Sequence, residues 1–367
     1  MQPHSDAHFG EMAIKLGFTT LRRVDEVLAL QEKKRERGGA PLRMGELMIR
    51  LGYLTEEQVR KVLLHEGAHH GHEEIPGYRL VSKLGHGSTG SVYKAVQLSM
   101  DRTVAIKVLA SRHAADPVIR NRFLKQARAS ARLTHANLIQ GIDVNVANGL
   151  HYSVMEFVDG PSVAEILRRG GALEEKRALG YALQAARALD HAYRHGILHG
   201  DLQPKDLLVT RDGLVKMCGL GFPTLASAGA AAPYYRSPEQ VRGEKDIDTR
   251  TDIYSLGAIL FHMETGDVPF PGTTAQLVAK QQLESAVPIP RSKNPAVSAK
   301  ADWLIRKMLS KARELRHATP AELQKDLEAL TAGAAPQGFS GDGGSPGGGP
   351  GRNTRLRRLT RARRYQR

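Results

Sequence analysis

The chain of 367 residues is poor in several features that would narrow its class. Cys218 is its only cysteine, so an internal disulfide is impossible and a reducing compartment is favoured. No apolar run approaches the ~18 residues that a membrane-spanning helix needs. The N-terminus lacks a basic flank followed by an apolar core, so the sequence shows no signal peptide. We therefore expect a cytoplasmic protein without a transmembrane segment.

Acidic residues are missing after Gly351, where eight arginines follow. Removing these eight leaves +7 of the formal net charge of +15 for the rest of the chain. The residues before them, 332–351, are rich in Gly, Ala, Ser and Pro, a composition typical of flexible linkers. We predict that residues 332–367 form a linker and an Arg-rich tail that binds a polyanion, either nucleic acid or an acidic membrane surface. The alternative is a solvated end without a partner.

The N-terminal region contains an internal repeat with a constant offset of 35 residues. Gly10 is echoed by Gly45, and Val24 by Val59. Apolar residues spaced by three and four predict amphipathic helices that must pack on each other. We expect residues 1–74 to form a helical repeat domain, in which a capping box of Thr55 and Gln58 starts the last helix.

This repeat resembles the small helical N-terminal domain of type II secretion ATPases, which is also fused to other bacterial signalling proteins. Some relatives of that domain bind a cyclic dinucleotide through an arginine at the start of each copy. Here Arg43 starts the second copy, and His8 stands in the first. We favour recruitment of protein partners by this domain and keep cyclic dinucleotide binding as the alternative.

The end of the repeat domain contains H-E-x-x-H at His65–His69, a zinc protease signature when a helix carries it. Gly67 and Gly71 weaken a helix here, and no third ligand is evident. We interpret the segment as a polar junction between two domains.

A hairpin signal marks the centre of the chain. The apolar runs Leu207–Thr210 and Leu214–Cys218 flank an Asp-Gly pair, which favours a tight turn between two strands. Such a hairpin would hold Asp201 and Asp206 on one side and Gly219 on the other.

The residues around that hairpin resemble the protein kinase family. HGDLQPKD, from His199, is similar to the catalytic loop H-R-D-L-x-x-x-N, and Gly219-Leu220-Gly221 stands where the family has D-F-G. Gly85–Val92 reads G-x-G-x-x-G-x-V, and Val104–Lys107 matches V-A-I-K. The resemblance covers residues 75–331. It implies an α+β bilobal kinase fold of bacterial Ser/Thr type, with a small, mainly β N-lobe and a larger α-helical C-lobe.

The resemblance also assigns roles to single residues. Asp201 takes the position of the catalytic base, Asp252 would brace the catalytic loop, and Arg316 would pair with Glu239. The nucleotide site is assigned to residues of the glycine loop, the strand lysine, the hinge and the floor: Gly85, Gly87, Gly90, Val92, Ala105, Lys107, Met155, Glu156, Val158 and Leu208.

Five functional positions depart from the family pattern. They are Gln126 for the Glu that pairs with Lys107, Gly200 for the loop Arg, Gln203 for the loop Lys, Asp206 for the Asn and Gly219 for the D-F-G Asp. No Glu occurs between Val108 and Val144, so a shift of register cannot supply the missing partner. Since Gly219 has no side chain, Asp206 is the one remaining candidate ligand for Mg²⁺.

These losses concern metal and γ-phosphate handling, whereas the scaffold residues remain. The sequence therefore predicts a pseudokinase that binds ATP weakly, with little help from Mg²⁺, and transfers phosphate poorly. One alternative is an active atypical Ser/Thr kinase that uses Asp201 and Asp206. The other is a docking scaffold that binds no nucleotide.

Overall fold

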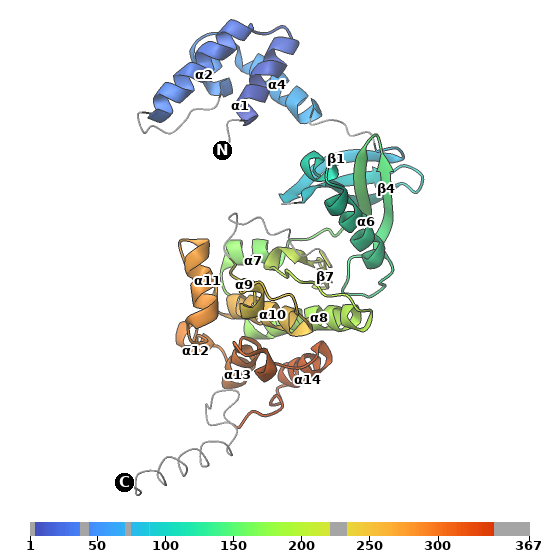
Figure 1. The fold of residues 1–367 in the computed structure, drawn as a ribbon, viewed down its shortest axis with the longest axis vertical. Coiled ribbons are helices and arrows are strands. Elements are labelled where there is room, and N and C mark those ends of the chain that lie inside the picture. The colour runs from blue at the N-terminus through green and yellow to red at the C-terminus, as the bar shows by residue number, and fades with distance from the viewer. Residues whose placement is uncertain (1–3, 37–43, 70–74, 88, 221–232, 341–367) are drawn as a thin grey trace, which may run out of the picture. The chain divides into compact units, whose positions relative to one another are not determined.

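The computed structural model describes residues 4–36, 44–69, 75–87, 89–220 and 233–340 (Figure 1). The chain divides into two compact units, residues 1–80 and 81–367, and each is taken by itself below. Within the described residues, no helix is both long and apolar enough to cross a membrane.

The first unit is helical as far as His69. Its helices are α1 (His4–Lys15), α2 (Leu21–Glu36), α3 (Met44–Arg50) and α4 (Glu56–His69). Helix α1 contacts the other three, and a core of apolar side chains from all four, including Val27, Met44, Met48 and Val62, is fully buried. Each helix is amphipathic, so burial of this shared stripe is what holds the unit together.

The two repeats pack in the same way. A Cβ atom added to Gly10 would lie 2.5 Å from the side chain of Val24, and one added to Gly45 would lie 3.1 Å from that of Val59. Each of these pairs is the other moved by 35 residues. In both copies the turn after the first helix also has a glycine with positive φ, +72° at Gly17 and +71° at Gly52.

Helix α4 begins as the sequence predicts and ends later. The side chain of Gln58 accepts a hydrogen bond from the N–H of Thr55, whose hydroxyl accepts one from the N–H of Gln58. The helix then continues through Gly67 to His69. One interior glycine costs only about 1 kcal/mol, and burial of α4 side chains such as Val62 offsets it. Gly71 lies outside the described residues.

The second unit starts with a five-stranded sheet in the order β1-β2-β3-β5-β4. The strands are β1 (Tyr78–Gly87), β2 (Gly90–Gln97), β3 (Arg102–Leu109), β4 (Gly141–Ala147) and β5 (Leu150–Glu156). The short helix α5 (Ser111–Ala114) leads into α6 (Pro117–Ala131), which packs against β4. The carboxylate of Asp116 caps α6 by accepting the N–H of Val118 at 2.8 Å.

Apart from one short hairpin, helices form the rest of the unit (Figure 1). They are α7 (Val163–Gly170), α8 (Glu175–Arg194), α9 (Pro238–Val241), α10 (Thr249–Thr265), α11 (Ala275–Glu284), α12 (Pro290–Lys293), α13 (Ala299–Met308) and α14 (Pro320–Thr331), with short turns η1 (Pro204–Asp206) and η2 (Arg313–Leu315). Helix α10 is buried along nearly its whole length and packs against α8, α13 and α14. The bilobal fold that the sequence predicts is confirmed.

The hairpin at the centre of the chain is also confirmed. Strands β6 (Leu207–Val209) and β7 (Val215–Met217) pair antiparallel, with Leu207 opposite Met217. Gly213 in the turn has φ of +83°, a conformation that glycine adopts without strain.

Residues 332–340, which composition alone places in the linker, contact the C-lobe. Pro336 is buried, and the N–H of Gln337 donates a 2.7 Å hydrogen bond to Asp326. The ring of Phe339 packs edge-on against Trp303, with centroids 6.2 Å apart. Two apolar side chains in a Gly-rich segment are therefore enough to dock its first residues.

The buried ion pair between Arg316 and Glu239 has the geometry that the sequence predicts. Both side chains are almost fully buried, and two N–H groups of the guanidinium donate to the two carboxylate oxygens at 2.6 and 2.9 Å. The hydroxyl of Thr251 donates to the same carboxylate at 2.9 Å. The pair ties the residues that precede α14 to the start of α9.

We expect Arg316→Ala to lower the free energy of unfolding by about 3–5 kcal/mol, because it leaves the carboxylate of Glu239 buried without its cation. Arg313→Ala is the matched control, since Arg313 pairs with exposed Asp246 and Glu314 and should cost no more than about 1 kcal/mol. Urea unfolding followed by circular dichroism measures both. Equal losses would show that the buried pair contributes nothing special.

A fragment of residues 1–74 is expected to unfold cooperatively by itself, because the apolar core of its four helices is closed. Gly10→Ala should lower its melting temperature more than Gly45→Ala, since the added methyl group meets Val24 at 2.5 Å and Val59 at 3.1 Å respectively. Thermal melts of the three fragments provide the measurement. A broad, non-cooperative melt of the unsubstituted fragment would refute independent folding.

Candidate active site

One buried carboxylate on α10 holds the catalytic loop in place. Asp252 on α10 accepts hydrogen bonds of 2.8 Å from the N–H groups of both His199 and Gly200. Gly200 has φ of +79°, so the residue that replaces the family arginine suits this turn. The bracing role predicted for Asp252 is therefore confirmed.

Asp201, the predicted base, is held by two neighbours. Its Oδ2 accepts a 2.8 Å hydrogen bond from the side-chain amide of Gln203, and its Oδ1 lies 3.4 Å from Nε of Arg236. The side chain is only 12% exposed. Both oxygens of the carboxylate thus contact donors of this chain.

Asp206 ends the turn η1 and is joined to the hairpin. One of its carboxylate oxygens accepts a 3.0 Å hydrogen bond from the N–H of Gln203. Its carbonyl accepts a 2.9 Å hydrogen bond from the N–H of Cys218, directly after β7. Burial raises the pKa of the Asp206 carboxyl above its ordinary value, because desolvation disfavours the charged form.

Gly219 follows Cys218 in the left-handed region, with φ of +84°. A Cβ atom built there would stand 3.7 Å from Oδ1 of Asp206 and 3.5 Å from Nε2 of His199, which is ordinary contact distance. A Cβ atom therefore fits at this position beside Asp206, and Asp is among the non-glycine residues that tolerate this φ best. Glycine leaves that side of the site without a carboxylate.

Lys107 lies on the central strand β3, opposite Val92 on β2 and Ser153 on β5. Burial lowers the pKa of Lys107, and the charge of Asp206 acts in the opposite direction. Because burial raises the pKa of Cys218 to about 12, that nearby thiol is neutral at pH 7. The charges of Lys107 and Asp206 therefore act on each other within this site.

Gln126 lines a cavity of about 350 Å³ beside α6. Gly196, Ile197 and Leu198, before the catalytic loop, and Leu220, after Gly219, line it too. Since α6 contains no acidic residue, no carboxylate of this helix can meet Lys107.

The glycine loop connects β1 to β2. Gly90 has φ of +156°, and a Cβ atom there would stand only 1.9 Å from the carbonyl oxygen of Val108, so glycine is required by the sheet itself. Around Gly85 and Gly87, by contrast, a Cβ atom would meet nothing closer than 4.0 Å. These two glycines have the space that close approach of a ligand to the backbone requires.

The hinge residues are the last two of β5 and Val158, which follows it. Met155 is opposite Ala105 on β3, and the N–H of Glu156 donates to the carbonyl of Gln140 at 3.0 Å. The carboxylate of Glu156 pairs with Lys216 at 2.8 Å. The N–H and the side chain of Glu156 thus already have partners within the protein. Leu208 lies on β6 and is bridged to Ser162; Val158 is half-buried.

The residues present fit a nucleotide better than they fit its metal ion. The open glycine turn, the half-buried amine of Lys107 and the strand pair of Ala105 with Met155 suit a nucleotide. For Mg²⁺, Asp206 offers a carboxylate and Gly219 offers nothing. Among the residues that the structure describes, no group of three or more His, Cys, Asp or Glu side chains is arranged to hold a metal ion.

Arg236 is a site residue that the sequence does not reveal. It lies 35 residues after Asp201, and only the return of the chain before α9 brings the two together. The contact between Gln203 and Asp201 spans two residues and was within reach of local reasoning.

The family model of the protein kinase domain matches residues 78–327. The chain is 35% identical over 274 residues to the serine/threonine-protein kinase PknB of Mycolicibacterium smegmatis, which covers 71% of this chain and 44% of that protein. It is 31% identical over 259 residues to the serine/threonine-protein kinase PrkC of Bacillus subtilis, covering 68% of this chain and 40% of that protein. The chain thus spans about two-fifths of the length of these curated relatives.

Among solved structures, a double mutant of the PknI kinase domain of Mycobacterium tuberculosis is similar, with a TM-score of 0.58 and 25% identity. The similarity covers 70% of this chain and 96% of that one. The fold, the braced catalytic loop and the sequence matches agree. The chain belongs to the protein kinase family, and its relatives are bacterial serine/threonine kinases.

Proposed function

We propose that this chain is a nucleotide-binding pseudokinase in which phosphoryl transfer is impaired. The observation that carries the proposal is Gly219. It stands where the family has a metal-binding aspartate, in a left-handed conformation in which an added Cβ atom would meet no atom closer than 3.5 Å. Of the five departures from the family pattern, this one removes a carboxylate that the metal ion would need.

In an active kinase, Mg²⁺ neutralises charge on the transferred phosphate and the chain positions the reacting groups. Here Lys107, the glycine loop and the hinge would bind the nucleotide. Asp206 alone would face the metal ion. The carboxylate of Asp201 already accepts from Gln203 and Arg236, and these donors would make it a weaker base for a substrate hydroxyl, although a carboxylate oxygen can accept more than one hydrogen bond.

Two alternatives remain open. An active atypical kinase would hold Mg²⁺ through Asp206 and use Asp201 as base, and their proximity favours it: the charge of Asp201 contributes to raising the pKa of Asp206. A docking scaffold would bind no nucleotide at all. Transfer of phosphate from ATP would identify the active kinase. Binding of a nucleotide would exclude the docking scaffold.

The other parts of the chain would serve recruitment. We propose that the helical repeat binds a protein partner, because Leu21, Leu30 and Leu51 are exposed on it although they are large and apolar. Binding of a cyclic dinucleotide through Arg43 is the alternative, and Arg43 lies outside the described residues. The Arg-rich tail also lies outside them, and its binding to a polyanion stays a prediction.

Saturating ATP is expected to raise the melting temperature of the complete chain equally in EDTA and in Mg²⁺. A ligand at 100 times its Kd stabilises a protein by about 2.7 kcal/mol, which a thermal melt detects readily. In Gly219→Asp the shift should become larger with Mg²⁺, because a second carboxylate then faces Asp206. Absence of any shift at millimolar ATP would favour the docking scaffold.

Transfer of labelled phosphate from ATP should be far below the roughly 1–100 s⁻¹ of protein kinases. The triple variant Gly219→Asp, Asp206→Asn and Gln126→Glu should gain much more than any single change, since these groups act as a unit. The substrates are the chain itself and a generic basic protein, and Asp201→Asn provides the blank.

Gly213→Asp is the matched control for the reversion at Gly219. It places the same side chain on a glycine with φ of +83°, in open space at the hairpin turn. Any gain that it shares with Gly219→Asp is unrelated to the metal site. Robust turnover of the unsubstituted chain, abolished by Asp201→Asn, would overturn the pseudokinase proposal.

A further inference from the structure

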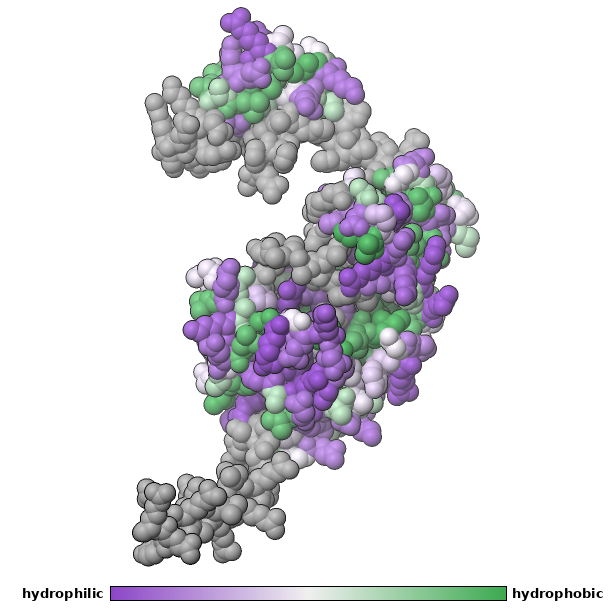
Figure 2. All heavy atoms as spheres, in the orientation of Figure 1, coloured by the Kyte–Doolittle hydropathy of each residue, from purple (hydrophilic) through white to green (hydrophobic). Residues whose placement is uncertain are grey.

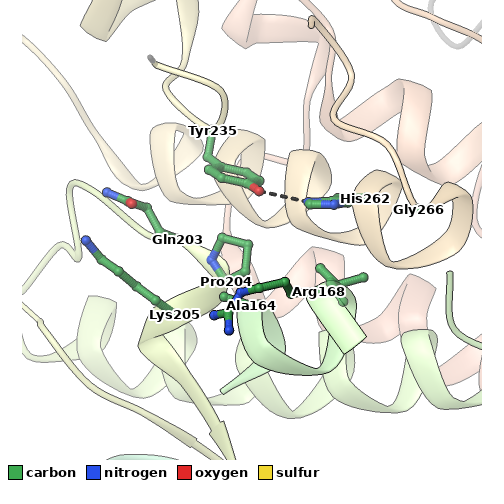
Figure 3. A pocket seen from close by; sticks show the side chains of 9 residues that line it. Ala164, Arg168, Gln203, Pro204, Lys205, Tyr235, His262 and Gly266 are labelled. Carbon is green, nitrogen blue, oxygen red and sulfur yellow. Dashed lines mark hydrogen bonds between the residues drawn. The ribbon is translucent and has the colours of Figure 1, made fainter. Parts of the chain in front are cut away.

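A second cavity, of about 460 Å³, lies beside the catalytic loop on the C-lobe (Figure 3). Its walls come from α7, η1, the segment before α9, and α10. The side chains that define its chemistry are Arg168, Gln203, Pro204, Lys205, Tyr235 and His262. None of the residues that we assigned to the nucleotide lines it, so the cavity is separate from that site.

The cavity is cationic. The nine described residues that line it include two cations, Arg168 and Lys205, and no carboxylate. Both cationic side chains belong to exposed residues, so their charges are accessible from solvent. Figure 2 shows the C-lobe as mainly hydrophilic on the face it presents, and a polar site on this lobe is in keeping with that surface.

The acidic groups nearby are already engaged. Glu165, one turn before Arg168 on α7, accepts hydrogen bonds from the N–H and the hydroxyl of Ser162 at 2.8 and 3.1 Å. Asp267, which follows Gly266, lies 3.6 Å from Lys293. Asp201 contacts Gln203 and Arg236. None of these three carboxylates lines the cavity, and neither does that of Asp206, so the charged side chains that an entering anion contacts are Arg168 and Lys205.

The rest of the wall is rigid and suits a peptide. The hydroxyl of Tyr235 and Nδ1 of His262 are hydrogen-bonded at 2.8 Å (Figure 3), which fixes both rings. Burial lowers the pKa of His262, so its ring is neutral at pH 7. Pro204 and Leu167 are buried and form an apolar floor. Apolar walls with a few convergent polar groups are the ordinary make-up of a ligand site.

The cavity is one hydrogen bond away from the candidate base. The amide of Gln203, which lines the cavity, donates directly to Oδ2 of Asp201 at 2.8 Å. A peptide that presents a hydroxyl group to Asp201 would therefore place a neighbouring side chain against Arg168 and Lys205.

From this arrangement we infer that the cavity binds an acidic side chain, Asp or Glu, of a peptide segment that lies along the catalytic loop. The guanidinium of Arg168 suits a carboxylate, which it can bind through two parallel N–H groups. Because this is a binding site, the inference goes beyond the proposed function. It holds whether or not the loss at Gly219 has stopped phosphoryl transfer.

Fluorescence anisotropy with the complete chain tests the inference. The probes are two labelled peptides of equal length, one with Glu on both sides of a central Ser and one with Gln in their place. We expect the Glu peptide to bind about five- to tenfold more tightly, as one or two partly exposed ion pairs allow. Equal affinity of the two peptides would overturn the inference.

Arg169 supplies the matched control, because it is the next residue on α7, is also exposed, and does not line the cavity. Arg168→Glu should abolish the preference for the Glu peptide, and Arg169→Glu should change it by less than about twofold. Equal losses in the two variants would indicate diffuse attraction to a basic chain and would overturn the site.

A third peptide, with Lys in place of Glu, separates recognition from damage to the fold. Arg168→Glu should bind this peptide more tightly than the unsubstituted chain does, because the charge of the wall is then reversed. Damage to the fold would weaken all peptides alike and would contradict the inference. A phosphoserine peptide is the last arm: binding of that peptide alone, without the Glu peptide, would overturn the assignment to a carboxylate.

Discussion

The hydrogen bonds from His199 and Gly200 to the buried carboxylate of Asp252 are the constraint on which the site depends. A carboxylate away from water is costly unless donors satisfy it, and these two backbone N–H groups do so. The loop must therefore keep its path for α10 to remain packed in the core. This path of the loop determines where Asp201, Gln203 and Asp206 lie. It also determines the position of the cavity next to them.

The residues that hold the fold together are retained, whereas the departures from the family pattern lie at other positions. Asp252, Glu239 and Arg316 stabilise the C-lobe and are intact, with short hydrogen bonds and little exposure. Under the proposed function, the groups that are replaced would act on a bound phosphate or metal ion. Changes at such positions would then cost little stability. Gly219 shows this most clearly, because glycine suits the left-handed backbone that the position requires in any case.

Much of the fold could be predicted from the sequence because its signals are local or belong to matched motifs. The Asp-Gly turn, the cap at Asp116 and the 35-residue repeat needed only neighbouring residues, and Arg316 needed only its spacing from Glu239. The remainder depends on contacts between distant segments. Arg236 reaches Asp201 only after the chain has passed through the hairpin, and the cationic cavity joins α7 to α10 across the catalytic loop. Composition and periodicity carry no information about contacts between segments that are distant in the sequence.

The contact of Phe339 with Trp303 gives the molecule an optical property of its own. Trp303 is the only tryptophan in the chain, and it lies at the edge of the C-lobe, where the segment after α14 docks. Lys307 stands over the same ring, with its ammonium 5.1 Å from the centroid. Indole emission excited selectively therefore reports on this one corner: it follows the undocking of residues 336–339 and the melting of α13, and is silent about the helical repeat at the other end of the chain.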